Sequence, residues 1–93
     1  MYLAKGNPQN GLDYALRALR VDKKAYGPDS VKAAARARSL SQILQANGNL
    51  KVSLVYAQRA FAIYLSTYGP DSLQTKEEAA SVKMIEESIA AQR

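Results

Sequence analysis

The sequence predicts an all-α fold of antiparallel helical hairpins, and three observations lead to this fold class. A five-residue motif recurs at a fixed distance, glycine-containing turns separate segments of similar length, and apolar residues within those segments recur every three or four positions. Such spacing places apolar side chains on one face of an α-helix, and no segment alternates as a half-buried strand does. Because a hairpin repeat cannot bury its apolar face alone, we expect the hairpins to stack.

An internal repeat organises the chain. The motif Tyr-Gly-Pro-Asp-Ser occupies residues 26–30 and recurs unchanged at residues 68–72, an offset of 42 residues. Further matches at this offset are Leu12 with Leu54, Tyr14 with Tyr56, Ala15 with Ala57, Arg17 with Arg59, and Ala18 with Ala60. The common register indicates two copies of one structural unit.

The first two predicted helices meet at the first copy of the motif. A helix over residues 8–25 runs into Gly-Pro-Asp-Ser, which has the composition of a turn. Ser30 is a suitable N-cap for a second helix over residues 30–47, because its hydroxyl can accept a hydrogen bond from a free backbone N–H. The two segments therefore form an antiparallel pair.

The last two predicted helices follow the same logic. Asn-Gly-Asn at residues 47–49 starts a helix over 50–67, and Ser72 caps a helix over 72–92. We expect core stripes of Ala33, Ala37, Leu40 and Leu44, of Leu50, Leu54, Phe61 and Leu65, and of Ala79, Val82, Ile85 and Ile89. The aromatic residues expected to pack between helices are Tyr14, Tyr56, Phe61 and Tyr64.

The composition argues against an enzyme. The chain lacks both cysteine and histidine, which removes the commonest zinc ligands, thiolate nucleophiles and the side chain that titrates nearest neutrality. Its paired glutamates are adjacent on a helix and point apart, and no phosphate-binding glycine loop is present. We expect no catalytic residues, no metal, no cofactor and no small-molecule substrate.

No segment has the length or apolar character of a membrane span or a secretory signal. We therefore expect a cytoplasmic protein without a membrane partner.

The repeat resembles a known family. Residues 48–56, 59–63 and 68–71 resemble the long, 42-residue tetratricopeptide repeat of kinesin light chains, although Ser30-Val31 and Ser72-Leu73 stand where that family has His-Pro. The segment 69–80 also looks like the final repeat of clustered-mitochondria proteins, which are linked to messenger RNA. These resemblances imply hairpins stacked into a right-handed superhelix with a concave binding face, and they admit RNA as a partner.

The resemblance places the binding face on the helices at 30–47 and 72–92. The residues opposite their core stripes are Ala35, Arg38, Ser39, Gln42 and Gln45, and Glu77, Ala80, Ser81, Met84 and Ser88. Among these, the partner-binding candidates are Arg38, Ser39, Gln42, Gln45, Ser81 and Met84. Arg38 can bind a carboxylate or phosphate in a bidentate contact, or it can be solvated or bridge to an acid on the next repeat.

The net charge of +5 is concentrated in the first half, where residues 1–51 carry nine Lys or Arg against three Asp. Arg20 and Lys24 on one helix, and Lys32 and Arg36 on the next, are candidate contacts for an anion or RNA. A solvated face is the alternative, because few exposed aromatic residues are available to stack on bases.

The function expected from these observations is a protein-interaction scaffold, with RNA binding or an architectural role in a large assembly as alternatives. Residues 1–6 align with residues 43–48, so the expected organisation is one array over 1–93. Within it, 1–5 ends a preceding helix, 8–25 is the second helix of a truncated repeat, 30–67 is a full hairpin and 72–92 starts the next repeat. Such an array is expected to be a fragment that needs neighbouring repeats or self-association.

Overall fold

The computed structural model describes the backbone of residues 8–92, with side chains from Asp13 onward. Four helices follow in chain order: α1 (Pro8–Tyr26), α2 (Val31–Ala46), α3 (Leu50–Tyr68) and α4 (Leu73–Ala91). Each agrees with its predicted segment to within one residue at either end, and no strand occurs in the described part. The predicted end of a preceding helix at residues 1–5 lies outside the described residues.

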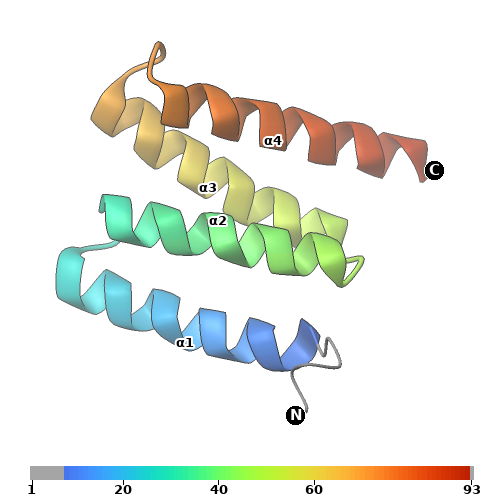
Figure 1. Ribbon diagram of the computed structural model, residues 1–93, viewed down its shortest axis with the longest axis horizontal. Coiled ribbons are helices and arrows are strands. Elements are labelled where there is room, and N and C mark those ends of the chain that lie inside the picture. Colours follow the sequence, from blue (N-terminus) through green and yellow to red (C-terminus); the bar gives the residue numbers. More distant parts are fainter. Residues whose placement is uncertain (1–7, 93) are drawn as a thin grey trace.

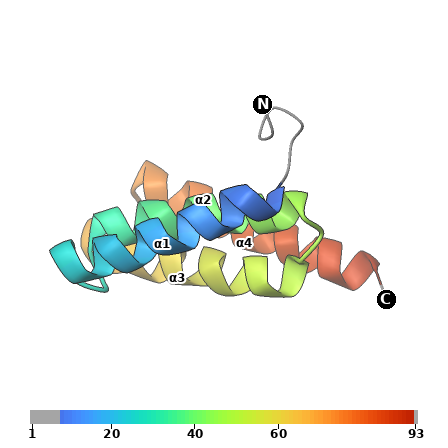
Figure 2. The ribbon, with the colours of Figure 1, turned by 90° about the horizontal axis from the view of Figure 1, so that it is seen from below.

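Successive helices run in opposite directions and lie in a row from α1 to α4, with α3 behind α2 (Figure 1). Seen from below, α4 starts on the side of α2 and slants toward the side of α3 (Figure 2). Contacts are extensive only between helices adjacent in sequence, from α1 with α2 to α3 with α4. Each helix is therefore held by its immediate neighbours, as in a repeat array.

The two copies of the Tyr-Gly-Pro-Asp-Ser motif form the same turn. Gly27 and Gly69 have φ values of 95° and 87°, a conformation that favours glycine. In each copy the glycine N–H donates to a carbonyl of the last turn at 3.0 Å, and the serine N–H donates to the glycine carbonyl at 3.4 Å. Ser30 and Ser72 then accept hydrogen bonds from the N–H groups of Ala33 and Thr75 as N-caps.

A different turn joins α2 to α3. Gly48 has a φ of 82°, its N–H donates to the Gln45 carbonyl at 3.0 Å, and the Asn49 N–H donates to the Leu44 carbonyl at 2.8 Å. This pair of bonds is a Schellman motif, which ends α2. Asn49 then caps α3, because its side chain accepts from the Val52 N–H.

Small residues form the contact between α2 and α3. One core cluster joins Ala34 and Ala37 of α2 to Ala60, Ile63 and Tyr64 of α3. A second cluster joins α1 to α2 through Ala15, Leu19, Ala33 and Leu40, and Tyr56 borders both clusters. The alanines allow α2 and α3 to approach closely, so this hairpin is the centre of the core.

Two buried serines lie in the same hairpin. The Ser53 hydroxyl donates to the Ser41 carbonyl at 2.8 Å, and the two hydroxyl oxygens are 3.0 Å apart. Both side chains are buried, and this mutual bonding satisfies polar groups that would otherwise lose water.

The expected core stripe was correct for α2 and only partly correct for α3. Ala33, Ala37, Leu40 and Leu44 are all buried, whereas Leu65 is 39% exposed. The buried face of α3 consists of Ser53, Ala57, Ala60, Ile63 and Tyr64. This face combines small residues with Ile63 and Tyr64, and the expected stripe lies beside it on the helix, where Leu50, Leu54 and Phe61 are half-buried.

The expectation that Tyr14 packs in the core was also wrong, because its side chain is 73% exposed. Its repeat equivalent, Tyr56, packs against both core clusters. The difference arises from the neighbours: α3 has α2 on this face, and α1 has no helix there within the described residues.

Candidate functional site

The surface predicted to bind a partner lies on α2 and α4, and we call it the α2–α4 face. Its α2 residues Ala35, Arg38, Ser39, Gln42 and Gln45 are all exposed. On α4, Glu77, Ala80, Met84 and Ser88 are exposed and Ser81 is half-buried. Ser39 and Gln42 of α2 are the repeat equivalents of Ser81 and Met84 of α4. The two helices therefore contribute equivalent positions to this face.

An ion pair links the two helices of this face. Arg38 Nε lies 3.6 Å from Glu78 Oε2, and the Glu78 side chain is only 2% exposed while that of Arg38 is 45% exposed. The bridge from Arg38 to an acid on the next repeat, one of the alternatives for this residue, is thus present. A buried carboxylate requires such a partner, because transferring an unpaired charge from water into the protein is costly.

The environment around Glu78 raises the pKa values of two side chains, Glu78 and Tyr64. Burial raises the pKa of the Glu78 carboxyl, the Arg38 guanidinium partly opposes this, and neighbouring Glu77 adds to it. Burial also raises the pKa of the Tyr64 hydroxyl, and the Glu78 charge reinforces the effect. Tyr64 in turn stacks on Tyr68, with ring centroids 6.0 Å apart. A buried acid, an arginine and a tyrosine therefore meet at the contact of α2, α3 and α4.

Sequence reasoning missed Glu78 because it considered the paired glutamates of α4 only as catalytic candidates, and set them aside because adjacent residues on a helix point apart. Two signals could have identified it. The spacing of Thr75, Glu78, Val82 and Ile85 places it on the buried face of α4, and the repeat offset aligns it with Arg36. Arg36 itself contacts the preceding helix, so the equivalent position in both units carries a charge at an interface.

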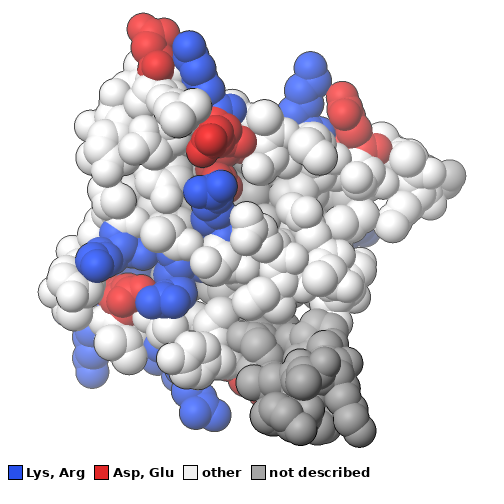
Figure 3. All heavy atoms as spheres, in the orientation of Figure 1, with Lys and Arg blue, Asp and Glu red and all other residues white. Residues whose placement is uncertain are grey.

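Of the basic residues proposed to contact an anion or RNA, some pair with other side chains of the protein and others are exposed to solvent. Arg36 Nε donates to Asp22 Oδ2 at 3.0 Å, so its charge is already paired within the chain. Lys32 lies over the Tyr26 ring, with Nζ 5.7 Å from the centroid. Figure 3 shows acidic and basic side chains next to one another on the face that it presents, rather than one continuous basic surface.

Arg20 and Lys24 border a hollow of about 540 Å³ near the end of α1, together with Val21, Lys23 and Pro28. Arg20 and Lys24 are both exposed. The structure thus brings Arg20 and Lys24 together and places Arg36 in an intramolecular pair.

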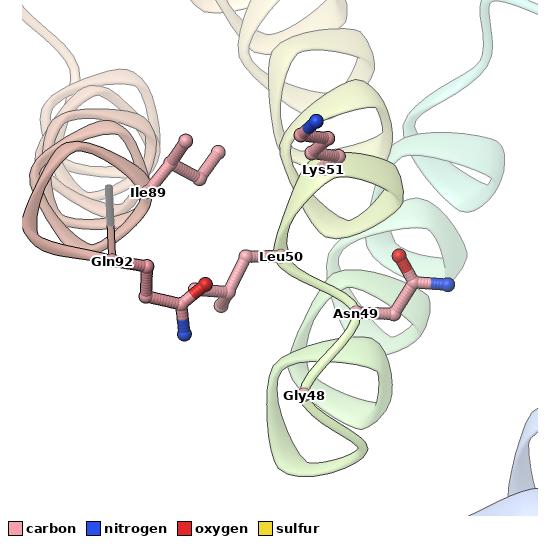
Figure 4. Close-up of a pocket in the computed structure, with 6 residues that line it drawn as sticks. All are labelled: Gly48, Asn49, Leu50, Lys51, Ile89 and Gln92. Atoms are coloured by element: carbon pink, nitrogen blue, oxygen red, sulfur yellow. The ribbon is translucent and has the colours of Figure 1, made fainter.

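A further hollow of about 400 Å³ lies where the start of α3 and the end of α4 diverge. It is lined by Gly48, Asn49, Leu50, Lys51, Ile89 and Gln92. Ile89 and Gln92 point from α4 toward Leu50, whereas Asn49 points away from α4 (Figure 4). Among the described residues of this lining, Lys51 is the single charged one.

Among the described residues there is neither a metal-binding cluster nor a membrane-spanning helix. No group of three or more Asp, Glu, His or Cys residues is placed to hold a metal ion. None of the four helices combines the length and apolar character needed to cross a membrane.

Repeated turns and nearest-neighbour helix contacts define this chain as a helical-repeat protein. The tetratricopeptide repeat family model matches residues 1–66. The chain belongs to the tetratricopeptide repeat family, whose repeats generally mediate protein–protein interaction and typically form a non-enzymatic scaffold. No curated protein and no solved structure shows significant similarity to the chain.

Proposed function

We propose that this chain is a protein-interaction scaffold that binds a peptide or a partner subunit on the α2–α4 face. The observation that carries the proposal is the Arg38–Glu78 pair, which links α2 to α4 while Ser39, Gln42 and Met84 stay accessible. A preorganised surface binds with a smaller entropic cost than one that must order on binding. The repeat belongs, on this proposal, to the long 42-residue type of kinesin-light-chain-like or clustered-mitochondria-like arrays in the cytoplasm.

The side chains of this face suggest how a partner is recognised. Gln42 and Gln45 offer amide donors and acceptors that can bond the backbone of an extended peptide. Met84 is 66% exposed and offers an adaptable apolar contact. Arg38 retains terminal N–H donors beyond the Nε contact, so an acidic group of the partner can bind there.

A peptide-display selection against the full chain tests the proposal, followed by affinity measurements with a selected peptide. Gln42→Glu together with Met84→Glu should weaken binding about tenfold or more, because both a hydrogen-bonding and an apolar contact change. The control is Ala79→Glu, since Ala79 is exposed on α4 and lies on the opposite side of that helix from Met84 and Ser88. Equal loss in the control, or no loss in the double variant, would show that binding occurs elsewhere.

RNA binding is a second candidate, favoured by the exposed Arg20 and Lys24 around one hollow on α1. Labelled single-stranded RNA titrated at two salt concentrations separates the candidates, because phosphate contacts release counterions and weaken with salt. Salt-sensitive binding that disappears in Arg20→Glu, Lys24→Glu would favour RNA. A Lys32→Glu variant tests whether α2 takes part, because Lys32 is exposed whereas Arg36 and Arg38 already pair with Asp22 and Glu78.

An architectural role in a large assembly is the third possibility. It predicts that substitutions on the α2–α4 face have no effect on assembly, whereas those on end faces do.

A further inference from the structure

A small hollow lies between α1 and α3, and we call it the α1–α3 hollow. Its volume is about 180 Å³, and its lining consists of Leu16, Leu19, Arg20, Lys23, Tyr56 and Arg59. In the view from below, α2 and α3 lie on opposite sides of α1 (Figure 2). The described lining contains no residue of α2 or α4, so the hollow is separate from the α2–α4 face.

Cationic side chains from both helices surround this hollow. Arg20 and Arg59 are exposed, and Lys23 is half-buried. α3 contains no acidic residue, and Asp22, which adjoins Lys23 in the sequence, is paired with Arg36. None of the cations of the lining forms an ion pair with a carboxylate among the described side chains. The hollow therefore has positive charge available for an anion.

The internal repeat shows that helix packing does not require these charges. At the 42-residue offset, Arg20 and Lys23 of α1 correspond to Ala62 and Leu65 of α3. The same helix of the repeat is thus built with uncharged residues at both positions. A half-buried ammonium such as that of Lys23 loses part of its hydration, and an opposite charge offsets that loss. A bound anion would supply the opposite charge that the described residues do not.

Arg59 is held in place at the edge of the hollow. Its guanidinium lies over the Tyr56 ring, 5.6 Å from the centroid. A planar guanidinium stacked on an aromatic ring is oriented before a ligand arrives and still presents N–H donors at its edge. Such donors bind phosphate oxygens in pairs, so Arg59 is suited to an oxyanion with several acceptor atoms.

The size and charge of the hollow limit its ligand. Its volume of about 180 Å³ is below the roughly 300–1,000 Å³ of pockets that enclose drug-sized ligands, so it suits one compact group. A phosphate monoester carries roughly −1.5 to −2 charges at neutral pH, and it matches several cations better than a carboxylate does. RNA also needs aromatic faces on which bases stack, whereas Arg59 lies over the Tyr56 ring. A single phosphorylated side chain therefore fits best.

We propose that the α1–α3 hollow binds a phosphorylated side chain of a partner protein, with Arg20, Lys23 and Arg59 around the phosphate. Leu16, half-buried in the same lining, offers an apolar contact to a neighbouring residue of the partner. Phosphorylation of the partner would then control its binding. The hollow shares no residue with the α2–α4 face, so the two proposals stand or fall separately.

The test titrates the isotope-labelled full chain with a short capped peptide that carries phosphoserine between two leucines. Nuclear magnetic resonance should show saturable chemical-shift changes in α1 and α3 around the hollow. The same peptide with serine or with glutamate in place of phosphoserine should bind at least about fivefold more weakly, because each carries less charge and fewer acceptor oxygens.

Variants of the chain locate the site. Arg59→Gln and, separately, Lys23→Gln should each weaken binding of the phosphopeptide about tenfold, because each removes a charged donor to the phosphate. The matched control is Arg17→Gln, since Arg17 is exposed, is the repeat equivalent of Arg59 and lies outside the lining of the hollow. It removes the same charge from the chain and should change the affinity by less than about twofold at physiological salt. Circular dichroism should show unchanged helix content in all the variants.

Three results would overturn the proposal: no binding of the phosphopeptide, equal affinity for the three peptides, or equal loss in Arg17→Gln and Arg59→Gln. Inorganic phosphate that binds the hollow as tightly as the phosphopeptide would mean that the ligand is free phosphate and not a phosphorylated partner. Labelled single-stranded RNA that binds more tightly than the phosphopeptide, and whose binding is lost in Arg59→Gln, would assign the hollow to RNA instead.

Discussion

At the scale of single residues, Glu78 makes the stability of the fold depend on pH. Its carboxyl is buried, its partner Arg38 is half-exposed, and its pKa is raised by burial. A raised carboxyl pKa means that the folded chain binds the proton more tightly than the unfolded chain does. The resulting contribution to stability is full below the ordinary pKa of 4.5 and is lost as pH rises through the raised value.

The first prediction concerns Glu78→Gln. The free energy of unfolding of the wild type, minus that of the variant, should fall as pH increases above about 4 and then level off, because only the wild type has a carboxyl that must ionise in the core. Urea denaturation at a series of pH values measures both curves.

Arg38→Met is the matched comparison. Removing the guanidinium deletes the charge that opposes the raised pKa of Glu78, so the loss of stability caused by its ionisation should become larger and extend to higher pH than in the wild type. A difference between wild type and Glu78→Gln that is flat with pH would show that the carboxyl has the same pKa in the folded and unfolded chains.

At the scale of elements, the contact of α2 with α3 depends on small side chains. Ala37 is 1% exposed against α3, while Ala35 on the same helix is exposed to solvent. The paired serines lie in the same hairpin and share its close approach. The short distance between α2 and α3 therefore depends on the small size of the alanine side chains at their contact.

The second prediction is that Ala37→Leu destabilises the chain by about 1–3 kcal/mol, because extra methyl groups in a filled contact force the helices apart. Ala35→Leu adds the same atoms on the exposed side and should change stability by less than about 0.5 kcal/mol. Chemical denaturation of the two variants provides the measurement. Similar losses in both would indicate that helix propensity, rather than packing, sets the cost.

At the scale of the whole molecule, the row of helices has principal extents of 39 × 37 × 18 Å. Each end helix has one extensive helix contact, and each central helix has two. In a quasi-one-dimensional array, stability is a sum of repeat and nearest-neighbour terms, so the ends are expected to open more readily than the centre.

The third prediction follows from this arrangement. Ile85 is 2% exposed where α4 packs on the rest of the chain, and Ile85→Ala should cost about 2–5 kcal/mol at that contact. Amide hydrogen exchange should then show a loss of protection in α4 that exceeds the loss in α1 and α2. Equal loss in all four helices would mean that the molecule opens as one cooperative unit.

The helices and turns were predictable from the sequence because the interactions that end them are local. Glycine at a positive φ, a serine N-cap and the repeated motif act over a few residues, so the ends of α1 to α4 follow from the order of residues. The 42-residue offset also supplied the equivalence of α2 with α4, and with it the residues of the α2–α4 face.

The tertiary structure decided which faces of those helices are covered. Tyr14 and Tyr56 are the same residue type at equivalent positions, yet one is exposed and the other packs between clusters, because only α3 has a helix on that side within the described residues. Glu78 is buried and pairs with Arg38 of another helix. Interactions between residues close in sequence determined the helices and their ends. Burial and charge pairing depend instead on neighbours that are distant in sequence.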